Sequence, residues 1–179
     1  MNSLIKIMPN FKKFNDYMKD VKENVNPIML SGLSDTGKVH LSYATSFYAE
    51  KPICVITYNE MQAKKLVKDF QYFTQNVIFF PKKEIITYDY IAESKDTYFA
   101  RIEALNKIHD KKADVIITTI EAATQKIIAE KTLYKNILIL KIGEELSLEE
   151  LKEKLIKLGY ERYENIEGKG QFSVRGRNS

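Results

Sequence analysis

The chain has 179 residues, of which 44% are hydrophobic and 29% are charged, and its formal net charge is +4. This length suffices for one well-packed core, or for one domain and part of another. The weak positive charge permits an acidic or nucleic-acid partner without arguing for one. Cys54 is the single cysteine, so an internal disulfide is excluded and a reducing, cytoplasmic location is expected. No apolar run reaches the roughly 20 residues of a membrane helix, so no membrane partner is expected.

Short apolar runs alternate with helical patterns through most of the chain. The runs predict strands at residues 27–31, 53–57, 76–80, 114–119 and 136–142. The helical patterns lie at residues 10–24, 37–50, 59–73, 95–109 and 119–130. Strands that are apolar throughout and alternate with helices indicate a parallel sheet covered on both faces. We therefore expect residues 1–131 to form a three-layer α/β domain, with Cys54 as a small core residue.

The pattern changes after residue 131, and residues 132–179 are predicted to begin a smaller α+β domain. The stretch SLEELKEKLIKLGY has a helix start at Ser147, with Glu150 completing a capping box, and a helix end at Gly159. Two extended segments around the following GKG turn predict a hairpin. One helix and a hairpin bury too little surface to stand alone, so this domain either leans on the first or is truncated.

The stretch SGLSDTGKVHLS contains most of a phosphate-binding loop. Gly32, Gly37 and Lys38 fall between a predicted strand and a predicted helix, where backbone N–H groups and a helix N-terminus hold phosphates. A working loop has Ser or Thr after the lysine to bind Mg²⁺, but this chain has Val39. Asp35 adds a negative charge inside the loop. We therefore predict a vestigial nucleotide site without turnover, and weak nucleotide or sulfate binding stays open as an alternative.

Other catalytic or metal-binding residues are not indicated. A Mg²⁺ site needs a second carboxylate at a strand end, but Glu144 and Glu145 are separated from the main apolar run, and Asp114 lies at the wrong end of its strand. His40 and His109 have no Cys or acid at metal-ligand spacing. We expect no catalytic residue, metal or cofactor in this chain.

A cluster of basic and aromatic residues lies near the C-terminus. It contains Tyr160, Arg162, Tyr163, Lys169, Phe172, Arg175 and Arg177. Arginines among aromatics on an exposed hairpin are typical of a protein-binding patch. The alternative is a solvated strand edge guarded by charges, and composition alone favours that interpretation.

The order of these features resembles the N-terminal, UvrB-like module of the bacterial transcription-repair coupling factors. The SGLSDTGK stretch stands where UvrB has an intact phosphate loop and the coupling factors have a degenerate one. The stretch FFPKKEIITYDYIAESKDTYFARIEAL is similar to the coupling-factor pattern, with matches at Pro81, Glu84, Tyr88, Asp89, Asp96, Arg101 and Ile102. Ala92 stands near a serine that the family often has. The stretch LGYERYENIEGKGQFSVRG resembles the closing signature, so the resemblance runs from about residue 10 to Gly176.

The resemblance implies a helicase-like (RecA-like) P-loop fold and a place in transcription-coupled excision repair. The parent protein would be an ATP-dependent DNA translocase that displaces stalled RNA polymerase and recruits UvrA. Its ATP, Mg²⁺, DNA and polymerase would be bound by regions absent here. This module would bind UvrA through its second domain, with family contacts matching Arg162, Arg175 and, more weakly, Phe172. In the parent, an intramolecular contact with the C-terminal part would cover that surface.

The chain departs from the family at its end. Arg177, Asn178 and Ser179 stand where an apolar strand carrying Asp and Pro is expected, so the second domain is predicted to be truncated. Two alternatives remain at this point. One is a UvrB-like P-loop ATPase with unusual metal coordination. The other is a DNA-binding domain of excision repair, whose affinity would fall steeply with salt.

Overall fold

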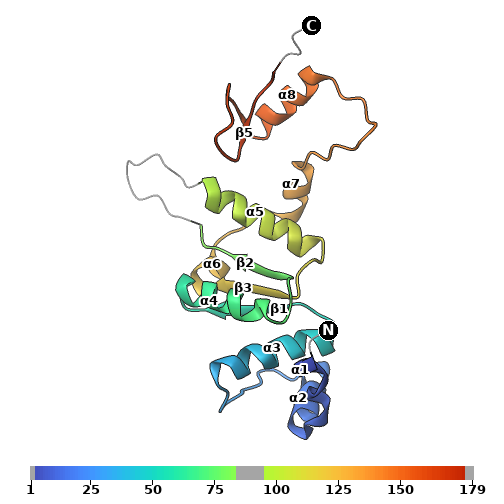
Figure 1. Ribbon diagram of the computed structural model, residues 1–179, viewed down its shortest axis with the longest axis vertical. Coiled ribbons are helices and arrows are strands. Elements are labelled where there is room, and N and C mark those ends of the chain that lie inside the picture. Colours follow the sequence, from blue (N-terminus) through green and yellow to red (C-terminus); the bar gives the residue numbers. More distant parts are fainter. Residues whose placement is uncertain (1–2, 84–94, 176–179) are drawn as a thin grey trace.

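The computed structural model describes residues 3–83 and 95–175 (Figure 1). The N-terminal elements are α1 (Ser3–Lys6), η1 (Met8–Asn10), α2 (Lys12–Lys22) and α3 (Asp35–Ala49). The sheet region follows, with β1 (Ile53–Thr57), α4 (Glu60–Gln71), β2 (Val77–Phe80), α5 (Lys95–His109), β3 (Val115–Thr119) and α6 (Ile120–Thr124). The last elements are α7 (Glu130–Lys135), α8 (Leu148–Lys157), β4 (Glu161–Arg162) and β5 (Gln171–Phe172).

The elements α1 to α6 are called the first unit here, and α8 with β4 and β5 the second. A three-stranded parallel sheet in the order β1-β3-β2 forms the centre of the first unit. In the central strand β3, Val115 and Ile117 face α3 and α4, where they pack with Phe70. On the other face, Ile78 of β2 packs with Ala104 of α5 and with α6. Both faces are covered, which explains why the strands are apolar throughout. The predicted parallel α/β architecture is therefore confirmed, on a small sheet.

Two of the five predicted strands are not strands in the structure. Residues 27–31 and 136–142 are irregular, and Met29 is 92% exposed. An apolar run becomes a strand only where a neighbouring edge supplies hydrogen-bond partners, and neither run meets one among the described residues. The full three-layer P-loop domain is consequently not shown, because the strand that should precede the phosphate loop does not join the sheet.

Two further expectations about the first unit are corrected. Cys54 is exposed rather than in the core, because β1 is an edge strand and its neighbours Ile53 and Val55 are the residues that face the core cluster. The helix predicted over residues 119–130 ends at Thr124. Gln125 leaves the helix in an extended conformation, and its side chain bonds to both backbone groups of Lys83, at 2.6 Å and 3.0 Å. A long-range polar contact thus ends a helix that the local sequence would continue.

The second unit contains α8 and a short strand pair. The predicted caps of α8 are confirmed: Ser147 Oγ accepts a hydrogen bond from the Glu150 N–H at 3.3 Å, and Gly159 follows the helix with φ of +86°. The predicted hairpin is wrong, because β4 and β5 pair in parallel, with Glu161 opposite Gln171. The connecting loop carries the chain back past the start of β4, so the two strands run in the same direction.

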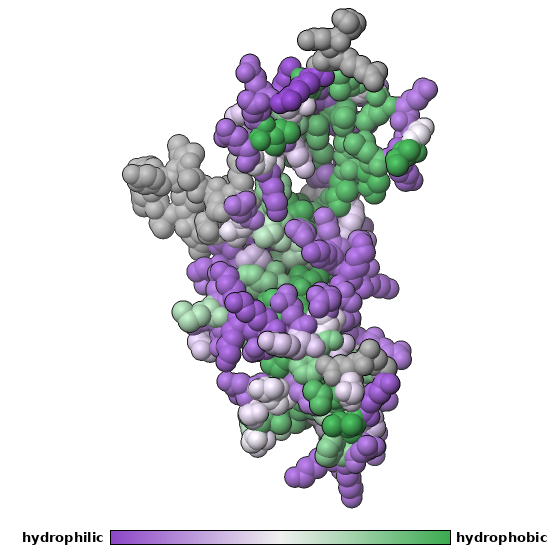
Figure 2. All heavy atoms as spheres, viewed as in Figure 1, coloured by the Kyte–Doolittle hydropathy of each residue, from purple (hydrophilic) through white to green (hydrophobic). Residues whose placement is uncertain are grey.

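The second unit exposes much of its apolar surface. No residue of α8 is buried. Figure 2 shows apolar atoms over the region where Figure 1 places α8 and the segment leading into it. The exposed aliphatic residues of α8, of the segment leading into it and of the loop after β4 are Ile139, Leu140, Ile142, Leu148, Ile156 and Ile166. The predicted domain boundary at residue 131 falls within helix α7. The boundary itself stays a prediction. Among residues 3–83 and 95–175, no helix is long and apolar enough to cross a bilayer.

Candidate functional site

The phosphate-loop residues form an ordinary helix N-terminus. Helix α3 begins at Asp35, and Ser34 caps it by accepting a hydrogen bond from the Gly37 N–H at 3.1 Å. One backbone donor that a phosphate would need is therefore already used. Lys38 Nζ lies 3.2 Å from Asp35 Oδ1, so the lysine that would reach phosphate instead contacts the loop's own carboxylate. Both side chains are more than half exposed, so this pair is weak.

Val39 is part of the core. Its side chain is 3% exposed and packs in a cluster with Ala63, Phe70, Val115 and Ile117. The position that carries the Mg²⁺-binding hydroxyl in a working loop thus contributes apolar packing here. Within the described ranges, no group of three His, Cys, Asp or Glu side chains could hold a metal ion. Gly32, the first glycine of the loop pattern, has φ of +76°, which is not the conformation of a residue at the end of a sheet strand.

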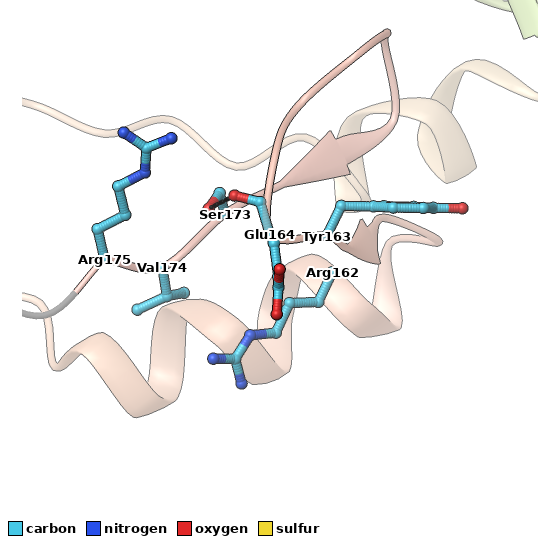
Figure 3. Close-up of a pocket in the computed structure, with 6 residues that line it drawn as sticks. All are labelled: Arg162, Tyr163, Glu164, Ser173, Val174 and Arg175. Atoms are coloured by element: carbon cyan, nitrogen blue, oxygen red, sulfur yellow. Dashed lines mark hydrogen bonds between the residues drawn. The ribbon is translucent and has the colours of Figure 1, made fainter.

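The two arginines matched to the UvrA contacts line one recess in the second unit. Arg162 lies on β4 and Arg175 follows β5, and both are exposed. The recess has a volume of about 430 Å³ and is lined by Arg162, Tyr163, Glu164, Ser173, Val174 and Arg175 (Figure 3). Figure 3 shows the Arg162 and Glu164 side chains extending to one side of the strands and the Arg175 side chain extending to the other. The arginines therefore flank the recess.

Phe172, the third matched residue, is buried. Its side chain is only 8% exposed, whereas Arg162 opposite it on β4 is exposed. Side chains of an extended segment point alternately to its two sides. Phe172 and Arg175 are three positions apart, so their side chains lie on opposite sides, one buried and one exposed. Phe172 is therefore closed to a partner in this structure, unlike the two arginines.

The residues matched in the Tyr-Asp region are only partly described. Glu84, Tyr88, Asp89 and Ala92 lie outside the described residues, as do Gly176 to Ser179. Pro81 and Arg101 come together: Arg101 is 8% exposed, donates to the Pro81 carbonyl oxygen, and lies 4.2 Å from the centre of the Phe80 ring. Burial lowers the pKa of Arg101 from its usual value. Asp96 lies in the first turn of α5 and is exposed, and Ile102 lines the groove described next.

An apolar groove of about 890 Å³ separates α5 from α8. Leu105 of α5 and Leu151 and Leu155 of α8 lie on its two sides. The two units approach closely at Gly170, where an added Cβ would lie 2.9 Å from Phe99 Cζ on α5. Gly170, which precedes β5, therefore packs closely against α5 of the first unit, whereas the groove separates α5 from α8.

Comparison with known proteins supports the resemblance seen in the sequence. The UvrB interaction domain family matches residues 138–178. The transcription-repair-coupling factor of Bacillus subtilis (strain 168) is 23% identical over 165 residues, which cover 91% of this chain and 14% of that protein. The corresponding factor of Staphylococcus haemolyticus is 26% identical over 169 residues, or 93% of this chain and 14% of that protein. A Staphylococcus aureus factor is 24% identical over 150 residues.

These relatives are much longer than this chain, which spans about 14% of the length of the first two. Their similarity to it includes the α/β unit as well as the second unit, because more than nine tenths of the chain is aligned. Both arginines that flank the recess fall inside the matched interaction domain. The predicted resemblance is confirmed: the chain is similar over almost its whole length to part of the transcription-repair coupling factors, and its C-terminal region matches the UvrB interaction domain.

Proposed function

We propose that this chain is a UvrA-binding module of a transcription-repair coupling factor and acts in the bacterial cytoplasm. The coupling-factor relatives and the UvrB interaction domain support this proposal. In a longer protein like those relatives, an ATP-driven DNA motor and the RNA polymerase contact would belong to other regions. An intramolecular contact with the C-terminal part of such a protein would cover the docking surface until it is needed.

The observation that carries the proposal is the pair of exposed arginines around the recess. A guanidinium presents five N–H donors in a planar fork that fits carboxylates, and it remains charged at all relevant pH values. Arginines that become desolvated at an interface often dominate the binding energy. Arg162 and Arg175 line the same recess although their side chains extend to opposite sides of it, so a partner that enters the recess can contact both. Acidic side chains of UvrA are the expected counterpart.

The proposal assigns no nucleotide turnover to this chain. Val39 in the core, Lys38 beside Asp35, and the irregular segment before the loop all argue against binding of a nucleotide with Mg²⁺ at residues 31–39. ATP and Mg²⁺ would then be needed only by the motor of the longer protein. Recruitment of UvrA remains as the contribution of this chain.

Isothermal titration of UvrA with the purified chain tests the proposal. We expect wild-type binding, and loss of about 2 kcal/mol, or roughly 30-fold in affinity, in each of the Arg162→Ala and Arg175→Ala variants. Lys64→Ala is the control, because Lys64 is an equally exposed cation on α4 of the first unit. Unchanged affinity in both arginine variants, or no binding by the wild-type chain, would reject the proposal.

A further inference from the structure

The loop between β4 and β5 is not held by packing. None of residues 161–169 is buried. Backbone bonds join only its ends, from the Glu161 N–H to the Gly170 carbonyl at 2.9 Å and from the Tyr163 N–H to the Phe172 carbonyl at 3.0 Å. In the described part of the chain, residues 164–167 take part in no backbone–backbone bond, and a turn at residues 169–170 leads into β5. Something other than a core or a ladder must therefore fix this loop.

Alternate side chains after Gly170 supply those contacts. Gln171 Oε1 accepts from the N–H groups of Glu167 and Gly168, at 2.8 Å and 3.1 Å. Ser173 Oγ donates to the Glu164 carbonyl oxygen at 2.9 Å. The next alternate residue, Arg175, donates from Nη2 to Asn165 Oδ1 at 3.3 Å. The side chains of Gln171 and Ser173 therefore hydrogen-bond to the loop near its end and near its start. The loop residue Asn165 in turn accepts a hydrogen bond from the guanidinium of Arg175.

The chemistry of the Gln171 contact is specific. Two consecutive backbone N–H groups point at one side-chain atom, so that atom must be an acceptor, which fixes the carbonyl oxygen of the amide in this place. A carboxylate oxygen could replace it, since an ionised acceptor binds backbone N–H groups at least as well. A thioether of similar length could not, because sulfur is a weak acceptor.

We propose that Gln171 and Ser173 are positioning residues of the UvrA-docking surface. They hold the loop so that Asn165 fixes Arg175 and Glu164 keeps its place in the recess wall beside Arg162. Neither side chain needs to touch the partner itself. This inference rests on the proposed function. It adds that the loop is already ordered before UvrA binds, so that the conformational entropy cost of ordering it is not part of the binding free energy.

The test compares Gln171→Met, which removes the acceptor at similar size, with Gln171→Glu, which keeps it. Hydrogen exchange in the chain should be about tenfold faster at the Glu167 and Gly168 amides in Gln171→Met. UvrA affinity, measured by titration, should fall about tenfold in the same variant. Gln171→Glu should restore slow exchange and affinity to within about threefold of wild type. Ser173→Ala is a second variant, which should weaken UvrA binding by several-fold without the amide effect at residue 168.

The outcomes separate this inference from the proposed function. If Arg175→Ala weakens binding while Gln171→Met and Ser173→Ala do not, the docking surface stands and the positioning role is rejected. If Gln171→Glu binds as weakly as Gln171→Met despite slow exchange, the role assigned to the acceptor is also rejected. Failure of the wild-type chain to bind UvrA overturns both proposals, and the exchange rates then report only how the loop is held.

Discussion

The two units of this chain are held in shape by different forces. In the first unit, β3 lies between two strands and two helical layers, and Val115 and Ile117 have no exposed surface. In the second unit, α8 has no buried residue and its strands have two residues each. Packing determines the first shape, whereas caps and side-chain-to-backbone bonds determine the second. A surface ordered by polar contacts keeps its arginines in water, where a partner can reach them.

The largest expected effect is a loss of stability when a core side chain of the first unit is shortened. Ile117→Ala should lower the free energy of unfolding by about 3 kcal/mol or more, because it removes a fully buried side chain from the central strand. Ile156→Ala on α8, where the side chain is 60% exposed, should cost no more than about 0.5 kcal/mol. Urea unfolding followed by circular dichroism measures both. Comparable losses in the two variants would show that α8 has a core of its own.

A smaller effect is expected where the units touch. Gly170→Ala should cost about 2 kcal/mol, because Gly170 has φ of +80° and its new Cβ would meet the Phe99 ring. Gly168→Ala is a matched control, since no atom lies within 4 Å of its added Cβ, and it should change stability by less than about 0.5 kcal/mol. Thermal unfolding of the two variants gives the comparison. Equal midpoints would mean that β5 does not depend on its contact with α5.

The smallest effect concerns the phosphate loop. Val39→Thr should cost about 1 kcal/mol, because it places a hydroxyl among Ala63, Phe70 and Ile117. We expect this variant to show only background hydrolysis of radiolabelled ATP with Mg²⁺, as we expect for the wild type. Chemical denaturation and the hydrolysis assay can use one preparation. Mg²⁺-dependent turnover by the variant would show that the missing hydroxyl was the sole defect of the site.

Local signals in the sequence predicted the first unit well. The strand at residues 53–57 was predicted with the observed bounds, because it is a short apolar run, and the helix at residues 95–109 was predicted with the observed end at His109. The cap at Ser147 was also predicted, since capping depends on neighbours within four residues. Features that depend on distant partners were missed. The apolar run at residues 136–142 has the composition of a strand but no neighbouring edge among the described residues.

The candidate site shows the same division. Its arginines could be found from the sequence by resemblance, but the parallel pairing of β4 with β5 could not, because a glycine-containing connection suggests a hairpin whatever path the loop takes. The buried state of Phe172 depends on which side of β5 faces α8, and the strand is too short to show a period. Gln171 carried no motif at all. Its role becomes visible only when the amides of residues 167 and 168 are placed in space.

The exposed run from Ile139 to Ile142 affects how the chain behaves in solution. It combines bare aliphatic side chains with backbone groups at residues 139 and 140 that have no backbone partner in the described structure. Such a segment can pair with the same segment of another molecule, which favours aggregates as concentration rises. This run therefore lowers the expected solubility of the isolated chain, and a second lysine, in place of Leu140, should raise it without touching the docking surface.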